Sequence, residues 1–204
     1  MIHSLGELSK DFRLYHDIIG CLVGALEAKD IYTRGHSMRV GDMSYQLAKT
    51  IGLKGEELEI IHIAAHLHDI GKIGVPDKIL NKEGELTASE WKAVKRHPEI
   101  GSNILNCSDE LKKISKLVLH HHERWDGKGY PYGLREKNIP LGSRIIAICD
   151  SIDSMTSDRP YRRAVSWEMC RQEIEANKRK QFDPFLVEAT KELWNYWKKE
   201  FFYK

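Results

Sequence analysis

The residues of this chain whose types and spacing could do chemistry are its histidines and aspartates. Its ten histidines recur beside aspartates instead of being spread evenly over 204 residues. Imidazole and carboxylate together suit borderline and hard divalent ions such as iron, manganese or zinc, whereas thiolates would favour softer sites. The candidate ligands are His36, the pair His68-Asp69, His97, the run His120-His121-His122 and Asp150.

The adjacent residues His68 and Asp69 follow an apolar stretch of predicted helix. A buried aspartate in such surroundings needs a positive partner, and a metal ion supplies one. Neighbouring residues project about 100° apart on a helix, so one can bind a single ion while the other reaches across to a second. The pair therefore favours a dinuclear site. A lone histidine is more often a surface or satisfied core residue, but that interpretation is weak for the whole set.

Four segments carry a close resemblance to a known family. They are YTRGH from Tyr32 to His36, HDIGK from His68 to Lys72, HHERWDGKGYP from His121 to Pro131, and DSIDSMTSDRPYR from Asp150 to Arg162. In this order the chain resembles the HD-GYP family over about residues 26 to 190. The resemblance implies an all-α fold, an HD-superfamily helical bundle around a dinuclear metal site, and hydrolysis of the bacterial messenger cyclic di-GMP.

The resemblance also implies a ligand set of seven residues. One ion takes His36, His68 and Asp150, the other takes His97, His121 and His122, and Asp69 bridges both. The expected cofactors are two divalent ions, most often Fe or Mn, with Zn, Ni and others open. We expect the ions to lower the pKa of a bridging water that attacks phosphorus in line, giving linear pGpG, GMP or both.

Basic side chains near these ligands are expected to bind the substrate. Lys72, Arg159 and Arg162 could clamp phosphate, since arginine binds it as a fork and lysine as a point charge; the alternative for each is a solvated surface charge. The catalytic candidates are Asp69 and Lys72. Asp30 is a weaker one, suggested because its counterpart in the family can face the leaving group. It could also simply end the first helix.

The loop Gly129-Tyr130-Pro131 has three interpretations. Tyr130 could stack on a guanine, a contact worth ~1–3 kcal/mol per base. The loop could instead contact partner proteins, or Tyr130 could pack against Trp125 and hold the turn.

Two departures from the family pattern affect the expected site. Some members hold a third ion through a glutamate at the position of Tyr32, so two ions are expected here. Ile31 stands where a proline is common and touches no ligand.

His62 and His66 lie one helical turn apart and could mimic a metal pair, but they match no family ligand and are expected to be packing or surface residues.

Glu123 and Asp126 follow the histidine run and have two interpretations. They could accept the free ring N–H of a ligating histidine, which would fix its tautomer. They could instead cap the turn or pair with Arg124.

The elements that must position these residues are helices, because apolar residues recur at three- and four-residue steps and strand signals are almost absent. A capping box of Thr87 and Glu90 predicts a helix start there that runs to His97 and beyond. The segments 71–85 and 125–140 are expected to be ordered loops. The other predicted helices cover about 14–28, 37–51, 55–68, 109–122, 143–156, 166–178 and 184–200.

Bulk properties predict one domain over residues 1–204, with a core from about 14 to 200. A net charge of +2 argues against a nucleic-acid polymer as partner. With neither a signal peptide nor a span for membrane insertion expected, we predict a cytoplasmic protein. The aromatic C-terminal helix would close the core and leave apolar surface for a homodimer or a regulatory domain. The four scattered cysteines predict reduced, partly buried thiols.

Two alternative functions stay open at this point. One is an HD-type hydrolase of another cyclic or linear nucleotide. The other is a cyclic di-GMP binding or scaffold protein with little turnover, although such a protein would be expected to lose metal ligands and none of the seven is missing.

Overall fold

The computed structural model describes residues 5–30, 35–158 and 163–201, with the side chains of the first helix from Asp17 on. Apart from turns and an isolated bridge between Lys178 and Phe182, these ranges are helical, which confirms the all-α fold class. The α-helices are α1 (Leu5–Lys29), α2 (His36–Thr50), α3 (Glu56–Leu67), α4 (Asp77–Leu80), α5 (Ala88–Val94), α6 (His97–Leu105), α7 (Lys112–Leu119), α8 (Leu141–Thr156), α9 (Trp167–Ala176), α10 (Pro184–Thr190) and α11 (Trp194–Phe201). The 3-10 helices are η2 (Ile70–Gly74), η3 (Asp109–Leu111) and η4 (Glu136–Asn138).

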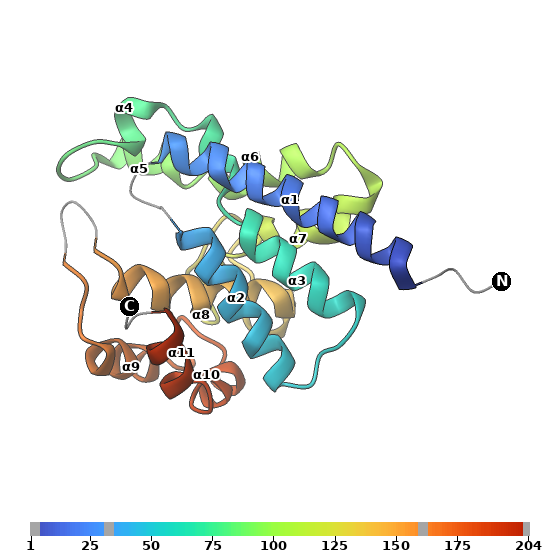
Figure 1. The fold of residues 1–204 in the computed structure, drawn as a ribbon. Coiled ribbons are helices and arrows are strands. Elements are labelled where there is room, and N and C mark those ends of the chain that lie inside the picture. The colour runs from blue at the N-terminus through green and yellow to red at the C-terminus, as the bar shows by residue number, and fades with distance from the viewer. Residues whose placement is uncertain (1–4, 31–34, 159–162, 202–204) are drawn as a thin grey trace.

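The centre of the fold is the packing of α2 against α3 on one side and α8 on the other (Figure 1). Helix α2 buries Val40, Met43 and Leu47 at three- and four-residue steps, the pattern of a helix with one apolar face. The core continues from Ile19 in α1 to Trp197 in α11. Since these helices share one apolar core, the positions of α2, α3 and α8 are fixed relative to one another.

Several predicted boundaries were wrong. The first helix begins at Leu5, not near residue 14. The capping box of Thr87 and Glu90 is present, but the helix that it starts ends at Val94, and α6 begins at His97. Pro98 lies in the first turn of α6, where it is tolerated, and it disfavours a continuous helix through its neighbours.

Other segments are more divided than predicted. The predicted helix 109–122 consists of η3 and α7 and ends at Leu119, and the predicted helix 184–200 is split into α10 and α11. The expected loop 71–85 contains most of η2 and all of α4, whereas 125–140 is a loop apart from η4.

The cysteines are free thiols: Cys149 and Cys170 are buried, whereas Cys21 and Cys107 are exposed. Among the described residues, none of the helices combines the length and apolar composition needed to cross a bilayer.

Candidate metal centre

His68 and Asp69 lie at the turn where α3 ends and η2 begins, not within a continuous helix as predicted. Leu67 is the last residue of α3, and Asp69 precedes the first residue of η2. Both side chains are buried, with 1% and 4% of their residue surface exposed. The apolar face of α3 thus ends in two polar side chains that point inward and need polar partners.

Asp69 lies between two groups of histidines. Its Oδ2 atom is 3.5 Å from His68 Nε2 and 3.9 Å from His36 Nε2, and its Oδ1 atom is 3.3 Å from His97 Nε2. His121 Nε2 extends the second group at 3.2 Å from His97 Nε2. The two carboxylate oxygens therefore face different groups, which is the arrangement that a bridging ligand requires.

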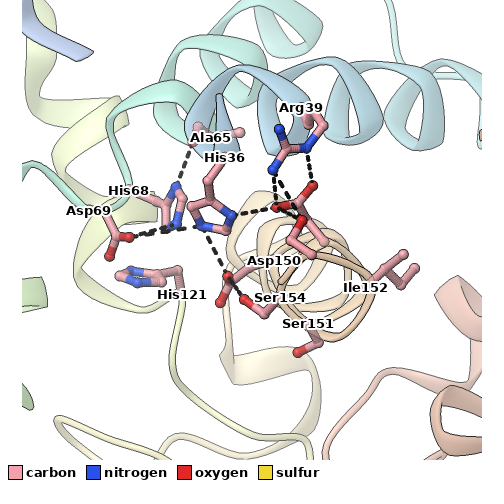
Figure 2. Close-up of polar contacts among 12 residues, drawn as sticks. His36, Arg39, Ala65, His68, Asp69, His121, Asp150, Ser151, Ile152 and Ser154 are labelled. Carbon is pink, nitrogen blue, oxygen red and sulfur yellow. Dashed lines mark hydrogen bonds and ion pairs between the residues drawn. The ribbon is translucent and has the colours of Figure 1, made fainter. Parts of the chain in front are cut away.

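The other two predicted ligands complete these groups. Asp150, on α8, places Oδ1 3.3 Å from His36 Nε2, and Figure 2 shows His36 between Asp69 and Asp150. The ring of His122 lies 4.0 Å from that of His121 and 4.9 Å from that of His97, measured between centroids. The fold thus brings together all seven predicted ligands from segments as far apart as residues 36 and 150.

A close approach of backbones places His97 beside Asp69. A Cβ atom built on Gly71 would lie 1.8 Å from the carbonyl oxygen of His97, so no larger residue fits there without moving η2 away from α6. Glycine at position 71 therefore allows the contact between the two histidine groups.

The ring protons of three histidines are held by backbone carbonyls. Nδ1 of His68 donates to Ala65 O at 2.7 Å, Nδ1 of His97 to Val94 O at 2.8 Å, and Nδ1 of His121 to Val118 O at 2.6 Å. Because a carbonyl oxygen can only accept, Nδ1 carries the proton in each ring. Nε2, which faces Asp69 or its neighbours, then offers a lone pair to a cation.

His36 is held by a carboxylate instead. Its Nδ1 donates to Asp153 Oδ2 at 2.7 Å, and Asp153 also accepts hydrogen bonds from Arg39, at 2.5 Å from Nε and 3.0 Å from Nη2. The sequence interpretation missed Asp153 and Arg39. Their signal was present in the spacing, because each lies three residues after a ligand, one helical turn along α8 or α2 from Asp150 or His36.

In the described chain, Glu123 and Asp126 make no hydrogen bond with His121 or His122, and Glu123 Oε1 lies 3.9 Å from Nδ1 of His120. Glu123 is buried and accepts from the backbone N–H groups of Tyr132, at 2.7 Å, and Leu134, at 3.0 Å, which holds the following loop. Asp126 pairs with Arg124 at 3.0 Å. The alternative interpretation, in which these acids stabilise the turn, is the one that the contacts support.

The site keeps its carboxylates charged. Burial opposes ionisation of Asp69, but Lys72 and then the surrounding histidines outweigh it and hold its pKa well below the usual range. Burial also opposes ionisation of Asp150, but the hydrogen bond with His36 and the charge of that ring outweigh it and hold the pKa of Asp150 well below the usual range. Two anionic side chains therefore face the space between the histidines.

The pKa shifts of the histidines differ between the two groups. Burial, joined by the neighbouring rings, lowers the pKa of His121 and lowers that of His122 to about 3, and burial also lowers that of His97. Burial opposes protonation of His36 too, but hydrogen bonds with Asp150 and Asp153 outweigh it and raise its pKa to about 9. The group around His97 thus consists of neutral imidazoles, the form that binds metal.

The donor set fits a divalent cation. The ligand atoms of His36, His68 and Asp69 lie within 4.8 Å of one another, and so do those of His97, His121 and His122. In the described part of the chain, the buried Nε2 atom of His68 has no hydrogen-bond partner, as expected for an atom whose partner is a cation. Nitrogen and carboxylate oxygen donors together suit borderline divalent metals.

Lys72 and Asp30 lie at the edge of this centre. Nζ of Lys72 is 2.7 Å from Asp69 Oδ2 and 3.1 Å from Asp30 Oδ2. Burial opposes the charged form of Lys72, but the two carboxylates outweigh it and raise its pKa. Asp30 follows the last residue of α1 and its N–H donates to Leu26 O at 2.9 Å, so it both ends the helix and contacts Lys72.

Tyr130 forms part of the wall beside the second histidine group. Its ring lies 4.8 Å from that of His122, and Nζ of Lys95 lies 5.5 Å from its centroid. The ring contact is therefore with a predicted ligand, whereas Trp125 is covered by Arg144. Lys95 is a third residue that the sequence interpretation missed. Tyr32, Arg159 and Arg162 lie outside the described residues.

The fold and the site define an all-helical domain with a buried histidine-aspartate centre suited to divalent cations. A family model described as HD domain matches residues 23–186, and HD domains are phosphohydrolases that use divalent metals. The chain belongs to this family, and its motifs place it among the HD-GYP proteins.

Curated relatives share much of the sequence. The chain is 44% identical over 169 residues to a cyclic di-GMP phosphodiesterase of Thermotoga maritima, covering 82% of this chain and 46% of that protein. It is 39% identical over 181 residues to the 3′3′-cGAMP-specific phosphodiesterase 2 of Vibrio cholerae, covering 88% of this chain and 35% of that protein. The matched region thus spans about a third to a half of these relatives.

A solved structure shares the fold. The HDG"Y"P protein from Bdellovibrio bacteriovorus superimposes with a TM-score of 0.64 at 17% identity, covering 78% of this chain and 51% of that chain. At this level of identity the likeness concerns the arrangement of the helices.

Proposed function

We propose that this domain is a metal-dependent phosphodiesterase that hydrolyses cyclic di-GMP to linear pGpG, GMP or both. The observation that carries the proposal is the position of Asp69, whose two carboxylate oxygens face separate groups of histidines. A structural site would need one closed shell, whereas two adjacent cation positions suit the charge of a phosphodiester. The relative of Thermotoga maritima, named a cyclic di-GMP phosphodiesterase, supports the choice of substrate.

The proposed ligands divide as the sequence predicts. His36, His68 and Asp150 would hold one ion, His97, His121 and His122 the other, and Asp69 both. The ions we favour are Fe or Mn, with Zn or Ni as alternatives. When bound, two such ions activate water and neutralise charge on the phosphate. The protein's part is to hold a ring proton of His68, His97, His121 and His36 on Nδ1, through three backbone carbonyls and Asp153, so that Nε2 is the atom turned toward the ions.

Lys72 is proposed to bind a phosphate oxygen. Its charge is retained because Asp69 and Asp30 hold its ammonium group, and 15% of its side chain is exposed at the edge of the centre. In this arrangement Asp30 positions Lys72, and a role toward the leaving group stays a prediction. The phosphate contacts of Arg159 and Arg162 also stay predictions.

Tyr130 and Lys95 are proposed to form the side of the site that meets a base. An aromatic ring with an ammonium group 5.5 Å from its centroid offers a stacking face and a positive charge. Four expectations stay predictions. They are contact of the Gly129-Tyr130-Pro131 loop with partner proteins, a homodimer, a single domain over 1–204 and a cytoplasmic location.

The test uses the chain purified without oxygen and loaded with Fe or Mn, its metal content measured by elemental analysis. We expect turnover of cyclic di-GMP, followed by chromatography of pGpG and GMP, to exceed turnover of 3′3′-cGAMP. A preference for 3′3′-cGAMP, the substrate in the name of the Vibrio cholerae relative, would favour a different cyclic dinucleotide. Tight binding without turnover at full metal occupancy would instead indicate a scaffold.

Two variants connect the activity to the site. Asp69→Asn keeps the side-chain shape but removes the bridging charge, so turnover should fall by orders of magnitude together with metal content. Lys72→Ala should raise KM by a larger factor than the factor by which it lowers metal content. Asp109→Asn is the matched control, because Asp109 is exposed and pairs with Lys112 away from the site. Normal activity of Asp69→Asn would contradict the proposal.

A further inference from the structure

A second cluster of metal-binding side chains lies on the opposite side of α3 from the centre described above. It consists of His62 and His66 on α3 and Asp42 on α2, whose ligand atoms all lie within 4.8 Å of one another. His66 and His68 are two residues apart, which turns them ~200° from each other around the helix. The two sets of ligands therefore face away from each other.

The geometry of the cluster matches a metal-binding pair on a helix. His62 and His66 stand four residues apart, and their Nε2 atoms are 3.0 Å from each other. Asp42 Oδ1 lies 3.6 Å from His62 Nε2. Two nitrogens that each lie ~2.0–2.1 Å from a zinc ion stand ~3.0–3.4 Å apart. The two imidazole nitrogens are thus already at the spacing of ligands around one ion, and the carboxylate of Asp42 lies slightly farther away.

The tautomer of His66 points its lone pair at the cluster. Nδ1 of this ring lies 3.1 Å from the carbonyl oxygen of Ser37, which can only accept, so Nδ1 carries the proton. Nε2 then offers a lone pair toward His62, in the same way that Nε2 is presented at the first centre. The ring is buried, with 2% of the residue exposed, so its direction is fixed by the surrounding protein.

Helix α2 makes room for this ring. A Cβ atom on Gly41 would lie 2.2 Å from Cε1 and 2.4 Å from Nδ1 of His66, so any side chain there would displace the imidazole. Glycine in the middle of a helix is destabilising relative to alanine. Its presence at position 41 is accounted for by the ring of His66, which packs closely against α2.

An open cavity of about 360 Å³ gives solvent access to the cluster. Asp42 and His62 line it from α2 and α3, and Tyr196 and Glu200 line it from α11. The carboxylate of Glu200 is a further oxygen donor on this wall. An ion held by three protein side chains would have positions left for water or for this carboxylate.

We propose that Asp42, His62 and His66 form a separate site for one divalent transition ion of the zinc type. Two imidazoles and one carboxylate are donors that such ions prefer. The ion would join α2 to α3. His36 is the first residue of α2, and His68 follows the last residue of α3. The site shares no ligand with the proposed catalytic centre, so either can be absent without the other.

The test counts zinc by elemental analysis after equilibrium dialysis of the full chain. We expect wild-type protein to hold one more zinc ion per chain than His62→Ala, whatever number the first centre holds. Asp42→Asn, at an exposed position, should lower zinc affinity at this site by at least tenfold. Asp109→Asn should bind zinc as wild type does. Equal zinc content and affinity in wild type, His62→Ala and Asp42→Asn would overturn the proposal and leave a simple histidine hydrogen bond.

A second measurement separates this site from the first. In the Asp69→Asn background, zinc should still raise the melting temperature, and adding His62→Ala should make that rise smaller. Circular dichroism of each metal-free variant checks that it is folded, and if His62→Ala is not, Asp42→Asn in the same background replaces it. A rise that stays undiminished with either substitution would assign the zinc effect elsewhere and refute the site. Failure of the phosphodiesterase assay alone would leave this result unaffected.

Discussion

Asp153 is the residue whose replacement most directly tests how the site holds its ligands. Its carboxylate is fully buried and accepts one hydrogen bond from His36, two from Arg39 and a longer one, at 3.4 Å, from the hydroxyl of Ser157. Burial opposes its ionisation, but these hydrogen bonds outweigh it and lower its pKa. Asp153→Asn keeps the shape and one acceptor oxygen, yet loses the charge and turns an NH₂ group toward a donor of His36 or Arg39.

The magnitude follows from the role of Asp153 behind a ligand. Loss of a group that orients a ligating histidine typically weakens metal binding ~10–100-fold, or about 1.4–2.8 kcal/mol. We expect the upper half of that range, because the carboxylate is buried and holds both His36 and Arg39. Arg39 has a side chain that is 27% exposed and can be partly solvated, so the free energy of unfolding should fall by only about 1–3 kcal/mol.

The assay is competition for metal against a chelator of known affinity, with denaturant unfolding of the metal-free protein measured in parallel. Activity of Asp153→Asn should return at high metal concentration, since Asp153 acts through His36 and does not touch the substrate. Asp109→Asn, exposed and paired with Lys112, should change neither quantity. A folded Asp153→Asn protein with wild-type metal affinity would refute the proposed role of Asp153.

Three further predictions concern the backbone, pH and metal removal. Gly71→Ala should lower the free energy of unfolding by about 1–3 kcal/mol and weaken metal binding, because the new Cβ atom would meet His97 O. The control Gly24→Ala has open space around it and should raise the free energy of unfolding by about 0.5–1 kcal/mol. Equal effects of the two substitutions in urea titrations would contradict this prediction. Glu90 has a pKa lowered to about 2, first by its hydrogen bond with Lys82, so the stability that it adds is present above its ordinary pKa of 4.5 and is lost as pH falls through about 2. The stability difference between wild type and Glu90→Gln should therefore shrink on acidification, and a difference independent of pH would count against the capping-box contacts. Chelation should lower the melting temperature, because a ligand at ~100 times its Kd stabilises by about 2.7 kcal/mol, and an unchanged transition would argue against bound metal.

Local features of the fold were predictable because their causes are local. The capping box of Thr87 and Glu90 and the apolar period of α2 involve residues within one or two helical turns. Helix ends were less predictable. The break before His97 depends on Pro98. The early start of α1 at Leu5 does have a local signal, because Ser4 and Glu7 stand at the spacing of a capping box, and the sequence interpretation missed it.

The sequence by itself determined the candidate ligands and, through the family motifs, their proposed division into two groups. It could not show how those side chains are held, because Asp153 lies 117 residues from His36 and the carbonyls that orient three rings belong to the backbone. It predicted packing or surface positions for His62 and His66, and it could not show that their Nε2 atoms lie 3.0 Å apart. Only tertiary structure decided these points, since the contact of Gly71 with His97 and of Gly41 with His66 depends on how whole helices pack.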